Sequence, residues 1–421
     1  MVRLSRRPSE RRFGDLVTGI MIAVASTTAG TVLAGQQAPA GGALTLAAAE
    51  ARALANNPTI IAARLQRPVD EAGVRVAGER PNPDLSFDAT RQTPRDALTL
   101  TVPFELGGKR GRRVALARAT VAAGEAAVTQ TIAQVLNDVR RAYFQVVAAD
   151  ARVTLAEGAQ GLAQRARDAA QARFSAGEVP GSDVTQADLA LADAEDDTTD
   201  AHGDATASRA DLNTLLGQPA STPILLADGL GASPVPTLSE ALDQANQVNS
   251  DLTVLDRQIA AQAARVNVAQ SQRIPDVSAG AGVTFNARPD FGTGWNVTFD
   301  ATLPLFTSHQ AGVTVETAEL AHLRAERTAR ALAIAGDVEA AYARLSSARA
   351  RLQQLQTRSL PLSVQVEQNA QGAYAAGEKG LTDLLEALQQ VRDIRLKALQ
   401  SSLDFQLALA DLEQAIGAPI R

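Results

Sequence analysis

Two stretches carry the residues best placed to do chemistry, because each sets carboxylates beside turn-forming glycines. They read "FSAGEVPGSD" at 174–183 and "YAAGEKGLTD" at 374–383. Asp183 and Asp383 stand where helices should begin, and a carboxylate there caps backbone N–H groups and favours the helix dipole. Glu386 follows Asp383 by three positions, which places both carboxylates on one helix face. Repeated around an axis by copies of the chain, this pair would attract cations to a narrow opening. The residues alone leave both roles open.

The sequence shows no catalytic constellation. It has no cysteine, which excludes disulfides and thiolate chemistry. The histidines at 202, 309 and 322 lack the spacing of metal ligands. The stretch "GGKRGRR" at 107–113 lacks the pattern of a phosphate-binding loop. We therefore expect no enzyme, no cofactor and no metal site. The basic cluster in this stretch could meet lipid headgroups or neighbouring carboxylates; it consists of Lys109, Arg110, Arg112 and Arg113.

The first 34 residues read as a secretory signal. Five arginines precede the apolar segment "LVTGIMIAVASTTAGTVLAG" at 16–35, and cleavage is expected after Ala34. An uncleaved membrane anchor is the alternative. Removal of this basic segment leaves a chain more acidic than the whole, whose formal net charge is −6. That balance argues against a nucleic-acid partner. The exported chain is expected to be periplasmic, secreted or a membrane β-barrel.

Six short matches in the same order indicate an internal duplication. They include Asn57 with Asn249, "PDLS" at 83–86 with "PDVS" at 275–278, the two glycine turns, and "LLGQP" at 215–219 with "AIGAP" at 415–419. The pattern predicts a first repeat over 35–219, a linker over 220–237 and a second repeat over 238–421. The hairpins are expected at about 83–104 and 275–305, and the helical tips at about 175–183 and 375–383.

Each repeat carries two segments with strict alternation of apolar and polar residues. In "WNVTFDATLP" at 295–304, for example, Trp295, Val297 and Phe299 alternate with small or polar residues. A half-buried soluble sheet would show the same period of two. Four strands are nevertheless a small sheet to support the long helices that the sequence predicts for the segments after the hairpins. Three chains would supply twelve strands, enough for a barrel with an apolar outside and a wet inside.

Long helices should follow the hairpins. Pro103 and Pro304 are expected to end the strands. The segments 112–174 and 307–374 then predict helices of about 95 Å at the usual rise of 1.5 Å per residue, with a kink at Pro361. Return helices should end near Leu216 and Ile416. Helices of this length must pair along their sides, as in coiled coils.

With these paired repeats, hairpins and glycine tips, residues 44–419 resemble the TolC-type outer-membrane efflux proteins. The stretch "PFELGGKRGRR" at 103–113 is similar to one common in the branch that exports heavy-metal cations. The resemblance implies a mainly α fold with β: a homotrimer with a long-helix α-barrel and a twelve-stranded β-barrel in the outer membrane of a Gram-negative bacterium. It further implies contact with outer-membrane lipid and two protein partners, a periplasmic adaptor and an inner-membrane pump of the RND type.

The resemblance also assigns roles at the tips. Asp383 and Glu386 match the family's acidic aperture, with Glu in place of a second Asp. Asp183, Tyr374 and Lys379 fall where the family holds its tip shut, and we expect an exposed Lys379–Asp183 pair within this tip latch. The tips would receive the adaptor through Gly177, Glu178, Gly181, Gly377, Glu378 and Gly380.

The expected function is therefore a passive exit duct for metal cations or drugs. A duct for type I secretion would share this architecture. A periplasmic coiled-coil scaffold or adaptor with a small sheet is the alternative from a different functional class.

Overall fold

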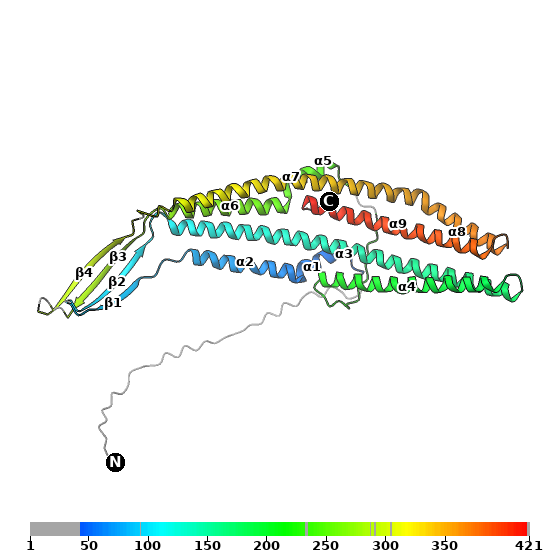
Figure 1. Ribbon diagram of the computed structural model, residues 1–421, viewed down its shortest axis with the longest axis horizontal. Coiled ribbons are helices and arrows are strands. Elements are labelled where there is room, and N and C mark those ends of the chain that lie inside the picture. The colour runs from blue at the N-terminus through cyan, green and yellow to red at the C-terminus, as the bar shows by residue number, and fades with distance from the viewer. Residues whose placement is uncertain are drawn as a thin grey trace, which may run out of the picture. The chain divides into compact units, whose positions relative to one another are not determined.

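The computed structural model describes residues 43–418, apart from residues 93, 232–234, 287, 290–291 and 304. The expected signal segment 1–34 and Pro304 lie outside the described residues. The same order of elements occurs twice (Figure 1). The first set comprises α1 (Leu46–Asn56), α2 (Pro58–Ala77), β1 (Asp84–Ala89), β2 (Asp96–Phe104), α3 (Lys109–Ser175) and α4 (Gly181–Leu215). The second comprises α5 (Leu238–Val248), α6 (Ser250–Ser271), β3 (Val277–Phe285), β4 (Thr293–Ala301), α7 (Gln310–Gln354), the π-helical turn η1 (Leu355–Ser359), α8 (Leu360–Ala375) and α9 (Leu381–Ile416).

The matched asparagines break the first helical segment of each set at the same place. The side chain of Asn57 caps α2 and donates to the carbonyl of Leu215 at the end of α4, 2.7 Å away. The side chain of Asn249 caps α6 and donates to the carbonyl of Ala415 near the end of α9, at 3.1 Å. Each asparagine therefore ties a helix start to the end of a return helix.

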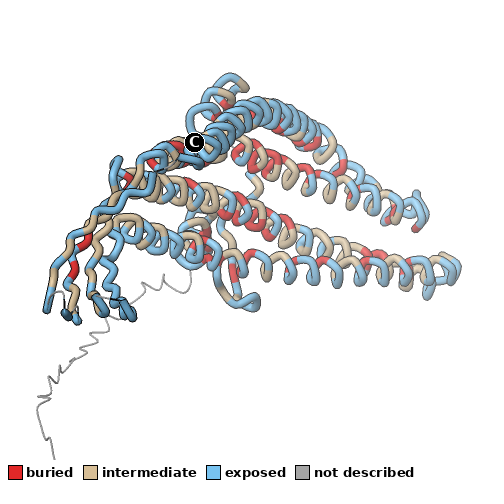
Figure 2. The backbone as a smooth tube through the Cα atoms, turned by 60° about the vertical axis from the view of Figure 1, so that its left-hand side comes forward, coloured by how far each residue is buried: buried red, intermediate tan, exposed pale blue. Residues whose placement is uncertain are grey.

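The long helices have the predicted lengths and pair through small residues. The buried positions of α4 include Ala187, Ala194 and Ala201, which recur every seven residues. Alanines at such positions let the α3 and α4 backbones approach closely. Ion pairs flank this seam, among them Arg167–Asp188 at 2.9 Å. In the second set, the predicted kink at Pro361 coincides with η1, which interrupts the helix just before this proline. Figure 2 shows buried residues along the facing sides of the helices.

The two hairpins join into one antiparallel sheet of order β1-β2-β3-β4. One face is apolar: in one row across the sheet, Phe87 pairs with Leu98, Leu98 with Val283, and Val283 with Trp295. These side chains are exposed; Trp295 is 83% exposed. The expected end of β2 at Pro103 was wrong, since Pro103 pairs with Ser278 inside the strand. Only Phe104 follows it, so the missing N–H removes at most one ladder bond near the end.

The polar face of the sheet is crowded. A Cβ added to Gly280 would lie 2.5 Å from the hydroxyl of Thr298, and one added to Gly282 would lie 2.5 Å from the amide oxygen of Asn296. Side chains converge on the concave side of a curved sheet and spread apart on the convex side. The small-polar face therefore has the character of an inside, and the exposed apolar face that of an outside.

The helices form a layer whose order changes along its length. Near the sheet, α3 contacts both α2 and α6, and α6 contacts α7. Toward the tips, α3 contacts α4 and α9, and α9 contacts α8. Between the repeats, Asn137 on α3 donates to the carbonyl of Ala410 on α9 at 2.7 Å, and Arg140 pairs with Glu413. One edge of the layer is thus made by α2 and α4, and the other by α7 and α8.

Candidate functional site

The two helix tips have nearly the same backbone. Gly177 follows the end of α3 and Gly377 follows the end of α8, with φ of +76° and +73°. The amide of Glu178 donates to the carbonyl of Arg173, and that of Glu378 to the carbonyl of Ala373, both at 2.9 Å. These bonds cap the helix ends in the way that glycine after a helix favours. The chain then reverses into α4 at Gly181 and into α9 after Gly380.

Asp383 caps α9, as the sequence predicted for one of its two possible roles. Its carboxylate accepts a hydrogen bond from the amide of Gly380 at 3.3 Å. Leu381 and Leu384 on the same turns are buried, whereas Asp383 and Glu386 are exposed. The two carboxylates therefore face away from the packed core of the tip. Their role as an aperture ring stays a prediction, because a ring requires several chains.

The expected ion pair of the tip latch, Lys379 with Asp183, was wrong within the chain. The ammonium of Lys379, in the turn between α8 and α9, lies 3.7 Å from the carboxylate of Asp383, four residues further along, and not against Asp183. Asp183 lies in the first turn of α4, where its carboxylate accepts from the hydroxyl of Ser182 at 3.5 Å. A four-residue separation brings Lys379 to Asp383 without any help from the other tip.

The tips are instead joined by residues that sequence reasoning missed. The guanidinium of Arg173 on α3 lies 5.1 Å from the ring centroid of Tyr374 and donates to the Tyr374 carbonyl at 3.5 Å. The hydroxyl of Thr382 lies 3.3 Å from the amide oxygen of Gln186 on α4. Tyr374 is buried with Ala166, Ala170, Ala187, Leu381 and Leu384. Of the expected latch residues, only Tyr374 therefore contacts the other tip through these bonds.

One sequence signal could have identified Arg173. The position before the tip aromatic is Arg173 in the first repeat and Ala373 in the second. An arginine that one repeat has and the other lacks is not required by the fold that both repeats share. It can therefore serve a contact between the two repeats. The carboxylate of Glu178 lies 3.3 Å from the Arg173 guanidinium and holds it near the tip.

The basic cluster at the junction of sheet and helices binds protein groups. The ammonium of Lys109 lies 2.7 Å from Asp276, which precedes β3, and Arg113 pairs with Glu105. Hydrogen bonding to Arg113 lowers the pKa of Glu105 below its ordinary value. Arg110 donates to the carbonyl of Gly78 at 2.5 Å and Arg112 to that of Asn267 at 2.8 Å. Lipid headgroups and neighbouring carboxylates were the two expected kinds of partner. The structure shows carboxylates beside Lys109 and Arg113.

The Lys109–Asp276 pair predicts an asymmetric response to mutation. The Lys109 side chain is 7% exposed and that of Asp276 is 49% exposed. We expect Asp276→Ala to lower the free energy of unfolding by about 3 kcal/mol, because it leaves a buried charge unpaired. Lys109→Met should cost less, since the remaining carboxylate is already hydrated. Denaturant unfolding of both variants measures the difference, and the reverse order would contradict this assignment.

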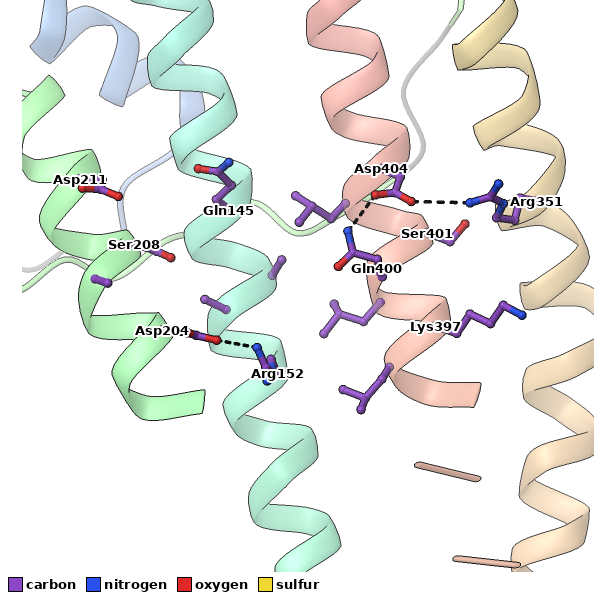
Figure 3. Close-up of a pocket in the computed structure, with 16 residues that line it drawn as sticks. Gln145, Arg152, Asp204, Ser208, Asp211, Arg351, Lys397, Gln400, Ser401 and Asp404 are labelled. Carbon is purple, nitrogen blue, oxygen red and sulfur yellow. Dashed lines mark hydrogen bonds and ion pairs between the residues drawn. The ribbon is translucent and has the colours of Figure 1, made fainter. Parts of the chain in front are cut away.

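A cavity of about 910 Å³ separates α3 and α4 from α9, with Arg351 of α7 at its side (Figure 3). Its charged groups largely pair with one another: Arg152 with Asp204 at 2.5 Å, and Arg351 with Asp404 at 3.8 Å. The cavity shows no nucleophile held by a base. Among the described residues, no group of His, Asp and Glu is arranged to hold a metal ion.

A search of the helices in the described part of the chain finds none that is long and apolar enough to cross a membrane.

One family model matches most of the chain, and a sequence relative and several solved structures resemble it. The profile of the family described as "Outer membrane efflux protein" matches residues 51–218 and 241–418. The "Cobalt-zinc-cadmium resistance protein CzcC" of Cupriavidus metallidurans is 29% identical over 375 residues, covering 86% of this chain and 87% of that protein. The solved structure of CusC superposes with a TM-score of 0.73 at 18% identity, covering 89% of this chain and 92% of that one. The outer membrane protein VceC of Vibrio cholerae gives 0.71 at 18% identity, covering 89% and 97%. The two structures show a shared fold.

Proposed function

The chain belongs to the outer membrane efflux protein family, and we propose that it is the exit duct for divalent metal cations in a tripartite export system. It is an outer-membrane channel protein that takes part in efflux. The proposal adds the cargo, assembly as a homotrimer, and direct contact of the tips with a periplasmic adaptor fed by an RND-type pump.

The sheet is the observation that carries the proposed assembly. Its apolar face is exposed, its polar face is crowded with small side chains, and β1 and β4 each end the sheet. A four-stranded sheet of this kind leaves two edges of unpaired backbone. Three copies pair these edges in a closed barrel of twelve strands, with apolar side chains toward lipid and polar ones toward water.

The proposed cargo rests on the named relative and on the chemistry of the tips. That relative is called a cobalt-zinc-cadmium resistance protein. At the second tip of this chain, Asp383 and Glu386 are both exposed. Threefold repetition would surround the opening with six carboxylates, which favour the passage of cations. Conduction further requires that such a ring bind the ions weakly enough to release them.

Membrane extraction tests the proposed function. We expect an SDS-resistant trimer in the outer-membrane fraction that shifts to the monomer mass on boiling. Purified protein should conduct ions in planar bilayers. Deletion of the gene should sensitise cells to cobalt, zinc and cadmium more than to lipophilic drugs, and a plasmid copy should restore growth. Release of the protein by osmotic shock would contradict the duct, and drug sensitivity alone would contradict the cargo.

A further inference from the structure

The cavity in Figure 3 has one wall with an excess of negative charge. This wall is formed by α3 and α4, and its charged groups are Arg152, Asp204 and Asp211. Arg152 and Asp204 pair at 2.5 Å, which leaves Asp211 over. Among the described residues, no cation pairs with the exposed carboxylate of Asp211. A cationic group that entered the cavity would therefore find a free counter-charge at this wall.

The facing wall, formed by α9 and α7, has an excess of positive charge. Its charged groups are Arg351, Lys397 and Asp404. Arg351 lies 3.8 Å from Asp404, whose carboxylate also accepts a hydrogen bond from Gln400 at 2.8 Å. Lys397 has no carboxylate partner in the part of the chain that the structure describes. The cavity is therefore bipolar, with a free carboxylate on one wall and a free ammonium on the other.

The rest of the cavity lining is largely apolar. Six alanine and leucine side chains line it, three from each wall: Ala148, Ala149, Ala207, Leu396, Leu399 and Leu403. The volume of about 910 Å³ lies within the range of sites for small organic molecules. A molecule with an apolar body and a charge at each end matches this combination better than a bare metal ion does.

A buried hydroxyl without a partner belongs to the positive wall. Ser401 of α9 lines the cavity and is 2% exposed, and its oxygen has no hydrogen-bond partner among the described residues. Buried polar groups are normally hydrogen-bonded, because burial removes their bonds to water. Rotation about the Cα–Cβ bond can turn this hydroxyl toward a bound molecule. Lys397 and Ser401 are four residues apart on one helix, so both can reach the same acid group.

The cavity lies on the face of α9 that also carries the proposed aperture acids. Asp404 follows Glu386 by 18 residues, which is five full helical turns, and Lys397 follows it by 11, close to three turns. The opposite face of α9 contacts the linker, where Gln406 donates to the carbonyl of Gly231. In the proposed trimer the aperture acids line the opening, so the cavity opens into the duct.

We propose that this cavity binds small organic zwitterions whose ammonium and acid groups are separated by an apolar body. The ammonium group meets Asp211, the acid group meets Lys397 and the hydroxyl of Ser401, and the body lies on the alanines and leucines. The place of the site inside the duct rests on the proposed function, whereas its chemistry rests on the two walls alone. A bound zwitterion narrows the duct, so the site adds an organic ligand to a channel proposed for metal cations.

Calorimetry with a rigid probe tests the two charges together. The probe is a biphenyl with an aminomethyl group at one end and a carboxyl group at the other. Biphenylcarboxylic acid and biphenylmethylamine carry the same body with one charge each. We expect the purified full-length protein to bind the zwitterion at least about tenfold more tightly than either analogue, after subtraction of the heat measured with empty detergent micelles. Equal affinities for the three compounds would overturn the proposal.

Two substitutions of exposed residues assign the charges to the walls. Lys397→Met should remove the advantage of the zwitterion over the amine, and Asp211→Asn its advantage over the acid. Arg349→Met is the control, since it removes an exposed cation of α7 outside the cavity, and it should leave all three affinities unchanged. An unchanged affinity for the zwitterion in either cavity variant, or an equal loss in the control, would remove the site.

Ser401→Ala separates a ligand contact from a structural role. The variant should weaken binding of the zwitterion about threefold or more, while the melting temperature stays the same or rises, because the oxygen that it removes has no partner to lose. A lower melting temperature with unchanged affinity would show that Ser401 serves packing and is no part of the site.

Conductance in planar bilayers separates the site from the proposed function. The zwitterion should lower the conductance of the unchanged protein and not that of Lys397→Met. A conducting trimer that binds no zwitterion overturns the site and leaves the duct intact. A protein that binds the zwitterion without conducting ions overturns the duct and leaves the chemistry of the site intact. Binding without any effect on conductance overturns the position of the cavity in the ion path.

Discussion

The Val297→Arg variant is expected to lose insertion into the outer membrane almost completely. Val297 lies at the middle of β4, on the apolar face beside Ala281, and its side chain is exposed in the single chain. In the proposed barrel this face meets lipid. Arginine on the lipid face near the midplane of a barrel costs about 2–4 kcal/mol, and a trimer would carry the change three times. The folded trimer should therefore disappear from the outer-membrane fraction.

Thr298→Arg is the matched control for this prediction. Thr298 is the next residue along β4 and lies on the polar face, paired with Gly280. An arginine there would extend into the water-filled side. We expect this variant to insert and to form heat-modifiable trimers, with altered conductance. Loss of insertion in both variants would show that the strand tolerates no arginine, and equal insertion would show that the apolar face does not meet lipid.

The Arg173→Ala variant is expected to open the tips. Its guanidinium joins the first tip to the second through the ring and the carbonyl of Tyr374. A partly exposed contact of this kind contributes about 1 kcal/mol per chain. Loss of three such contacts around a trimer amounts to about 3 kcal/mol, or roughly a hundredfold change in the balance between closed and open tips. We expect a higher single-channel conductance in planar bilayers.

Arg167→Ala provides the control, since it removes an arginine less than two turns away. Arg167 pairs with Asp188, so its contact joins α3 to α4 within the first repeat and does not reach the second tip. Its conductance should stay close to that of the unchanged protein. Equal effects of the two variants, or none from Arg173→Ala, would remove Arg173 from the closure of the tips. Lys379→Ala should have the smaller effect, because Lys379 pairs with Asp383 on its own side.

Local patterns in the sequence predicted the elements well. The alternation around Val297 and Phe299 identified the strands, and the distances between prolines and glycine turns identified the long helices and their returns. The acid at 383 was predicted to cap α9, and it does. Strands, helices and helix caps depend on the spacing of residues that are close in the sequence, so the sequence alone is enough to predict them. The aperture and the adaptor-docking tips stay predictions, because they concern other chains. The bounds of the signal segment, the two repeats and the linker stay predictions as well.

The partners of individual side chains were decided by the tertiary structure. Arg173 and Tyr374 are 201 positions apart, and they meet because α9 packs against both α3 and α8. Lys109 and Asp276 likewise meet because the two hairpins join through β2 and β3. The sequence determined which helices and strands form, because periodicity and turn residues act locally. Only the tertiary structure decided which charges meet, because an ion pair forms with whichever carboxylate lies within reach once the helices have packed.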